Sequence, residues 1–215
     1  LSVKLYEQGD KGGILGFNDY LFYGQAVSQA FPTKNGAERG LAFMEKARKD
    51  AKKRLDDIPE EVETKKEGEN DPEIQKKREA RLEAKKDYSY ATQQIAGMYS
   101  WIWRLTREEG DLQKVISELR ESIRLIEELE KSGIDVPMSR YAHNLLRYAM
   151  FLRILENDPD RMDIEKNFQK IVSLKPGNEL SLTASYLRWF QVFILADMGK
   201  YDDAQKRAQA AIVLD

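Results

Sequence analysis

Apolar residues recur at steps of three and four along most of the chain, which is the spacing of one face of an α-helix. The clearest stripe begins at Leu112, continues to Leu129 and stops at Ser132-Gly133. Turn residues separate it from similar stripes on both sides. The pattern therefore predicts an all-α protein with helices over residues 18–30, 37–55, 72–107, 112–131, 139–156, 163–174, 180–198 and 202–214.

The predicted helices fall into pairs, with short turns inside a pair and longer connections between pairs. We expect a glycine-containing entry arm and a charged mobile loop outside the pairs, because both lack a helical apolar stripe. The final pair ends on an apolar run and is a candidate for truncation at the C-terminus. The predicted segments are 1–17 (arm), 18–57 (first pair), 58–73 (loop), 74–133 (second, long pair), 138–178 (third pair) and 179–215 (fourth pair).

The fourth pair carries the clearest repeat signal. Small residues stand at Ala204, Ala208 and Ala211 of its second helix, and the first helix from Trp189 to Ala196 has the spacing W-x2-L-G-x2-Y. This pair resembles a tetratricopeptide repeat, in a divergent form. Phe193 replaces the usual glycine, and the period of the chain is about 40 rather than about 34 residues.

Weaker copies of the same unit precede it. The third pair closes with Pro176, where the family ends its second helix, and the first pair offers Tyr20, Tyr23, Gly24 and Gly40. The resemblance implies a right-handed α-α superhelix of about four repeats. In such a solenoid each pair buries its apolar face against its neighbours, and large aromatics on first helices fill gaps beside small residues on second helices.

Composition narrows the classes of function. Lys plus Arg number 35 and Asp plus Glu 37, for a formal net charge of −2, so no excess of positive charge points to nucleic acid. The absence of cysteine excludes disulfides and thiol chemistry. We find no apolar run of about 18 residues that would span a bilayer. The compartment stays open between the cytoplasm and a bacterial cell envelope.

Residues suited to catalysis are few. The only histidine is His143, within a predicted helix, and the glycines from Gly9 to Gly13 lack the spacing of a phosphate loop. Asp158, Asp160 and Asp163 alternate like calcium ligands but lack the glycine and the closing glutamate of a calcium loop. We therefore expect no enzyme activity, no cofactor and no metal site.

A run of basic residues from Lys46 to Arg54 could meet phosphate or acidic lipid. Basic and acidic residues alternate across the wider segment 45–86, however, and mixed charges on helices usually indicate a solvated face. We interpret the run as such a face.

The resemblance also implies a binding surface, because this family binds partners on a concave face lined by the first helices. Arginines together with amides on that face would suit an acidic segment or a C-terminal carboxylate, since guanidinium groups pair carboxylates through two hydrogen bonds. The residues so placed are Asn18, Gln25, Trp101, Arg104, Arg107, Arg153, Asn157, Gln191 and Ile194.

The predicted function is a non-catalytic scaffold or adaptor that holds another protein or peptide within a larger assembly. Two alternatives stay open. One is an envelope-associated accessory protein that binds a small molecule in an aromatic pocket. The other is a structural subunit that stacks through the ends of its repeats, with self-association through the C-terminal repeat.

Overall fold

The computed structural model describes residues 2–13, 15–59, 72–134, 136, 138–154, 166, 169–173 and 182–214. Within these ranges the regular structure is helical, with no strand, and consecutive helices pack in pairs. The all-α prediction is confirmed. The chain divides into two compact units, Leu1–Ile134 and Asp135–Asp215. Each unit is described by itself.

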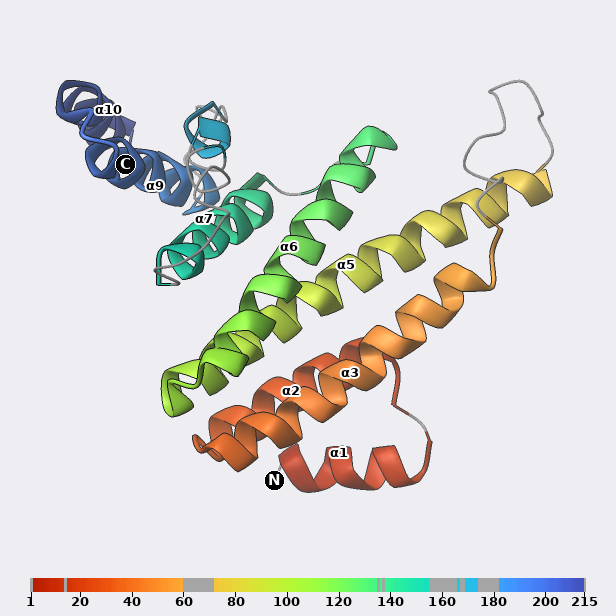
Figure 1. Cartoon of the computed structure of the whole chain (residues 1–215). Coiled ribbons are helices and arrows are strands. Elements are labelled where there is room, and N and C mark those ends of the chain that lie inside the picture. The colour runs from red at the N-terminus through yellow and green to blue at the C-terminus, as the bar shows by residue number, and fades with distance from the viewer. Residues whose placement is uncertain are drawn as a thin grey trace. The chain divides into compact units, whose positions relative to one another are not determined.

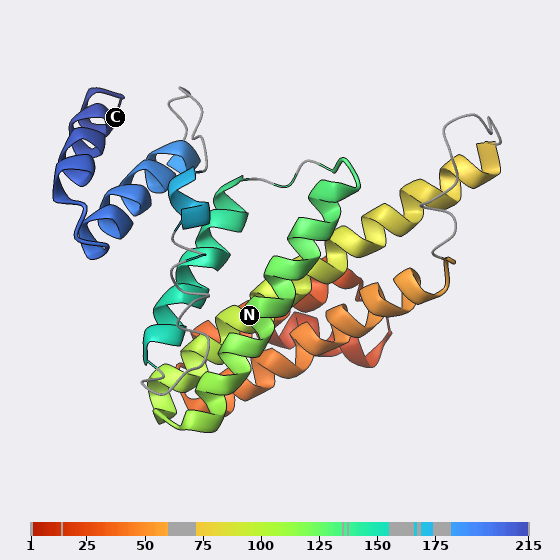
Figure 2. The ribbon, with the colours of Figure 1, turned by 45° about the horizontal axis from the view of Figure 1, so that its top comes forward.

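The first unit is a series of long helices packed side by side (Figures 1 and 2). α2 packs on α3, α3 on α5, and α5 on α6, so α5 lies between α3 and α6. The unbroken α5 confirms the expectation of a single long helix starting at Pro72. The bounds are α1 Ser2–Lys11, α2 Phe17–Ala30, α3 Lys34–Asp56, α5 Pro72–Thr106 and α6 Glu109–Lys131.

Local signals set the helix ends. The Thr33 hydroxyl caps α3 by accepting a hydrogen bond of 3.2 Å from the backbone N–H of Gly36. Gly133 follows α6 with a φ of 75°, and the next N–H, that of Ile134, donates back to the Leu129 carbonyl at 3.0 Å. This is the glycine-dependent helix stop that the sequence predicts at Ser132-Gly133.

Two glycines bring α2 and α3 into backbone contact. A β-carbon placed on Gly40 would lie 2.4 Å from the carbonyl oxygen of Gly24, and one placed on Gly24 would lie 2.6 Å from the carbonyl oxygen of Gly40. The crossing is packed by a buried apolar cluster that includes Leu21, Met44 and Ile95. The close crossing at small residues therefore occurs in the pair whose repeat signal is among the weaker ones.

The segment predicted as an entry arm, residues 1–17, contains a helix. Its residues form α1, which packs against α2 (Figure 1). The pattern did not predict this helix, because Ser2–Lys11 is short and its position depends on contacts with α2 and α3 that no local signal announces. Most of the charged loop predicted over 58–73 lies outside the described residues, which resume at Pro72.

The second unit contains α7 (Met138–Ile154), α9 (Leu182–Asp197) and α10 (Tyr201–Leu214). α9 contacts both α7 and α10. Residues 169–173 are helical, whereas the rest of the helix predicted over 163–174 falls largely outside the described residues.

The turn between α9 and α10 follows the sequence closely. Gly199 has a φ of 74°, and Ala204 and Ala211 are buried, as expected for small residues at a helix crossing. Phe193, which replaces the usual glycine of the repeat pattern, does not pack in the core, because its side chain is 64% exposed. Its neighbours Ile194 and Leu195 are buried instead.

Candidate functional site

α2 and α5 lie side by side and run in the same direction. The Gln25 side chain on α2 donates a hydrogen bond of 2.8 Å from Nε2 to Oε1 of Gln94 on α5. Beyond the C-terminal ends of these helices, Lys34 and Glu108 approach to 3.5 Å. The Gln25–Gln94 bond links α2 directly to α5, and the Lys34–Glu108 pair joins the first residue of α3 to the segment that follows α5.

One face of this helix pair exposes large apolar side chains. Phe22 is 59% exposed, Trp101 42% and Leu105 45%. Asn18, Phe22 and Gln25 follow each other at steps of four and three on α2. On α5, Gln94 stands four residues after Tyr90, Trp101 seven after Gln94, and Arg104 and Leu105 three and four after Trp101, so these residues lie on one stripe of the helix. We call this surface the α2/α5 face; its residues are Asn18, Phe22 and Gln25 of α2, and Tyr90, Gln94, Trp101, Arg104 and Leu105 of α5.

Basic groups lie at the C-terminal end of the α2/α5 face. The Arg104 side chain is exposed in the last turn of α5. Arg107 follows the helix in a left-handed conformation, with a φ of 58°, and its N–H donates to the Trp103 carbonyl at 2.7 Å. The Arg107 guanidinium carbon lies 4.7 Å from the centroid of the Trp103 ring. An anionic group that reached this end would therefore meet two guanidinium groups at the C-terminal end of α5.

The structure places the predicted partner-binding residues in different environments. Asn18, Trp101, Arg104 and Arg107 are exposed in the first unit, and Gln25 is half-buried in its bond to Gln94. The side chain of Arg153, on α7, and the whole of Asn157 lie outside what the structure describes.

Two predicted residues of α9 are internal. Ile194 is buried, and the fully buried Gln191 donates from Nε2 to the Ile171 carbonyl at 2.8 Å and accepts from Arg207 at 2.5 Å. A buried amide that must satisfy its polar atoms inside the protein serves the packing of the unit. We therefore leave Gln191 and Ile194 out of the candidate surface.

Sequence reasoning missed Phe22, Leu105 and Gln94. The sequence carries the spacing from Asn18 to Phe22 to Gln25, but the repeat pattern predicts that most large aromatics on first helices pack in the core. Phe22 and Tyr23 are neighbours in sequence, yet Phe22 is largely exposed and Tyr23 is fully buried. Which of the two faces the core depends on where α3 crosses α2, and this is not a local property.

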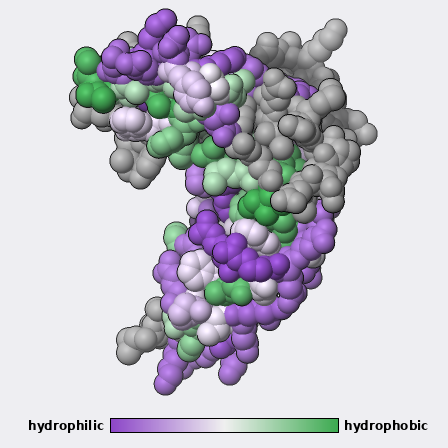
Figure 3. Space-filling model, turned by 60° about the vertical axis from the view of Figure 1, so that its left-hand side comes forward, coloured by the Kyte–Doolittle hydropathy of each residue, from purple (hydrophilic) through white to green (hydrophobic). Residues whose placement is uncertain are grey.

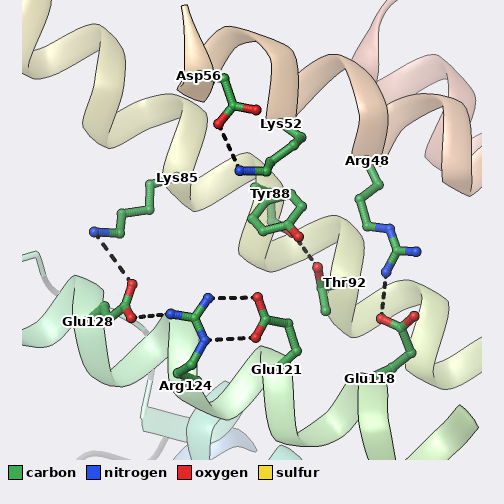
Figure 4. Close-up of polar contacts among 10 residues, drawn as sticks. All are labelled: Arg48, Lys52, Asp56, Lys85, Tyr88, Thr92, Glu118, Glu121, Arg124 and Glu128. Carbon is green, nitrogen blue, oxygen red and sulfur yellow. Dashed lines mark hydrogen bonds and ion pairs between the residues drawn. The ribbon is translucent and has the colours of Figure 1, made fainter. Parts of the chain in front are cut away.

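A second polar surface connects α3, α5 and α6 (Figure 4). Arg48 of α3 bridges Glu45 of its own helix at 2.7 Å and Glu118 of α6 at 2.6 Å. Farther along, Arg124 of α6 contacts Glu121 at 2.7 Å and also contacts Glu128. Of these ion pairs, Arg48–Glu118 joins α3 to α6, whereas the two pairs of Arg124 lie within α6.

The carboxyl groups in this network differ in their electrostatics. Burial raises the pKa of the Glu118 carboxyl, and Arg48 opposes that effect. The hydrogen bond from Arg124 lowers the pKa of the Glu121 carboxyl. The positive charges of the arginines in this network therefore neutralise the negative charges of the glutamates, and the surface has little net charge with which to bind a ligand.

Most of the described basic side chains from Lys46 to Arg54 form ion pairs of this kind. Besides Arg48, Lys52 pairs with Asp56 at 2.7 Å, and Arg54 pairs with Asp50 at 3.0 Å and with Asp87 of α5 at 2.8 Å. This arrangement agrees with a solvated charged face rather than a phosphate-binding one. His143, the only histidine, is exposed on α7.

The face of the molecule drawn in Figure 3 mixes hydrophobic and hydrophilic residues. Of the helices that the structure describes, none combines the length and the apolar character needed to cross a membrane.

Comparison of the chain with protein-family models, curated proteins and solved structures gives no match. Its role must therefore be argued from the described surfaces.

Proposed function

We propose that the protein is a non-catalytic, tetratricopeptide-like scaffold that holds a segment of another protein on its α2/α5 face. The observation that carries this proposal is the exposure of Phe22, Trp101 and Leu105 on that face. Large exposed apolar side chains gathered on one surface are typical of protein-binding sites.

The basic end of the face indicates the chemistry of the partner. Arg104 and Arg107 favour a segment with an acidic residue or a C-terminal carboxylate, since a guanidinium group binds a carboxylate through charge-assisted hydrogen bonds. The amides of Asn18 and Gln94 could bond the backbone of an extended peptide. The Gln25–Gln94 bond keeps the two helices in register beneath it.

The proposal predicts that Trp101 and Arg104 each contribute to binding. Peptides selected from a displayed library with free C-termini should bind the wild type, and Trp101→Ala or Arg104→Ala should each weaken that binding about tenfold or more, the cost of losing a buried anchor or a charged hydrogen bond. Isothermal titration with the selected peptides measures the loss.

Arg78→Ala is the matched control, because it removes the same side chain from the opposite end of α5. Its binding should equal that of the wild type. Peptides held equally by the wild type and by the Trp101→Ala, Arg104→Ala double variant, with circular dichroism unchanged, would move the site away from the α2/α5 face.

A structural subunit is the second candidate, and the second unit supplies its observation. Phe193, Ile212 and Val213 are exposed there, Val213 by 85%. Under this candidate the wild type associates with itself as its concentration rises, and the Ile212→Ser, Val213→Ser double variant stays monomeric in sedimentation velocity. Gln205→Ser, an exposed polar change on the same helix, is the control. A wild type that is monomeric at every concentration rules the candidate out.

A further inference from the structure

Among the described side chains, aromatic stacking and ion pairs attach α1 to α2 and α3. The rings of Tyr6 and Tyr23 stack with their centroids 5.0 Å apart and their planes 12° apart. Tyr23 in turn contacts Phe43 of α3, with ring centroids 4.1 Å apart. A weaker ion pair joins Arg39 to Glu7 at 3.3 Å. The short helix thus covers aromatic rings that belong to the α2/α3 pair.

A second set of contacts surrounds the ammonium group of Lys46. Its Nζ donates to both oxygens of the Asp10 carboxylate at 2.7 Å. It also lies 5.3 Å from the ring centroid of Tyr20 and 4.9 Å from that of Phe43. The Tyr20 hydroxyl completes the arrangement by donating to Asp10 at 3.0 Å. Two rings and a carboxylate around an ammonium group form a recognition site for a cation, filled by the protein's own lysine.

The electrostatics agree with this geometry. The hydrogen bond from Lys46 holds the pKa of the Asp10 carboxyl below its ordinary value. The Lys46 side chain, which supplies the positive charge of this ion pair, is 46% exposed. A half-exposed ion pair contributes little free energy and is screened by salt. The attachment is therefore specific but easily opened.

The residues that follow the C-terminal end of α1 allow the helix to move relative to α2. Gly12 and Gly13 follow the helix directly, and Gly13 has a φ of 66°, a conformation that favours glycine. Paired glycines leave the chain free to swing when the side-chain contacts break.

We propose that α1 is a detachable strap, which the Lys46 ammonium holds over the aromatic cluster formed by Tyr20, Tyr23 and Phe43. Detachment would uncover Tyr23, which is fully buried while Tyr6 stacks on it. Tyr20 and Tyr23 project from the side of α2 opposite to Gln25. The strap is therefore a separate device from the α2/α5 face and does not depend on its function.

Hydrogen–deuterium exchange of the full chain, followed in peptides covering residues 2–11, tests the strap. Lys46→Gln should speed exchange of the α1 amides about threefold, as expected for loss of a partly exposed ion pair. Asp10→Asn should do the same, and Lys46→Arg should retain most of the protection. In the wild type, 1 M NaCl should speed α1 exchange, because salt screens the pair.

Lys34→Gln is the matched control, since it removes a lysine of similar exposure that pairs with Glu108 instead. It should leave α1 exchange unchanged. The proposal is overturned if Lys46→Gln leaves α1 protected, or if Lys34→Gln speeds α1 exchange as much. It is equally overturned if Lys46→Gln speeds exchange in α2 and α3 as much as in α1, because the residue would then stabilise the whole unit rather than the strap.

Discussion

Replacing Gly40 by alanine is expected to lower the free energy of unfolding of the first unit by about 1–2 kcal/mol. The added methyl group would lie 2.4 Å from the Gly24 carbonyl oxygen, which is backbone and cannot rotate away. α2 and α3 must separate, and an overpacked contact of this kind costs about 1–3 kcal/mol. Replacing a helical glycine by alanine usually raises the free energy of unfolding by about 1 kcal/mol, and this gain offsets only part of the cost of overpacking.

Urea unfolding measures this loss best in a Trp189→Phe background, because the remaining Trp101 and Trp103 both report on the first unit. Gly110→Ala is the control: a β-carbon there meets no other atom within 4 Å, so its effect should be neutral or slightly stabilising. The Gly24→Ala, Gly40→Ala double variant should lose less than the sum of the single losses, because one separation of the helices relieves both contacts. A Gly40→Ala variant as stable as the wild type would contradict the close crossing.

The helices themselves could be predicted from the sequence because periodicity is a local property. The stripe from Leu112 to Leu129 predicts α6, and within it Val115, Leu119 and Leu129 are fully buried. Glycine and proline fixed several helix ends, such as Gly133 after α6 and Pro72 at the start of α5. These residues restrict the backbone whatever the rest of the chain does.

The candidate surface could be predicted only in part, because exposure depends on which helix lies opposite. The resemblance to the repeat family predicts that Trp101 and Arg104 lie on an open face, and both are exposed. The same resemblance predicts exposure of Gln191, which is fully buried because α9 packs against more than one neighbour. A stripe of polar residues identifies a helix face, but it does not say whether another helix covers that face.

Arg81 is a further residue that the pattern could not place. It stands within a strongly charged segment and reads as a surface residue, yet only 6% of it is exposed. Its guanidinium Nη1 donates to the Leu55 carbonyl at 2.7 Å and also to the Ile58 carbonyl. Leu55 is in the last turn of α3, where carbonyls have no partner within the helix. Arg81 of α5 therefore caps the C-terminal end of α3, and its charge complements the negative end of that helix's dipole.

Arg81→Met should lower the free energy of unfolding of the first unit by about 2–4 kcal/mol. Methionine fills much of the same space but donates no hydrogen bond, so it leaves the Leu55 and Ile58 carbonyls without this donor at a cost of about 1–3 kcal/mol for each buried group. Arg81→Lys should lose less, because an ammonium group keeps the charge but cannot reproduce the fixed geometry of guanidinium donors.

The same urea unfolding in the Trp189→Phe background gives the size of the loss, and hydrogen exchange locates it. Amides in the last turn of α3 should exchange faster in Arg81→Met than the amides of α6, because the cap acts on one helix end. Arg78→Met, about one turn away on α5, is the control and should change the stability by less than about 0.5 kcal/mol. If Arg81→Met and Arg78→Met proved equally stable, the buried guanidinium would fill space in the unit without capping α3.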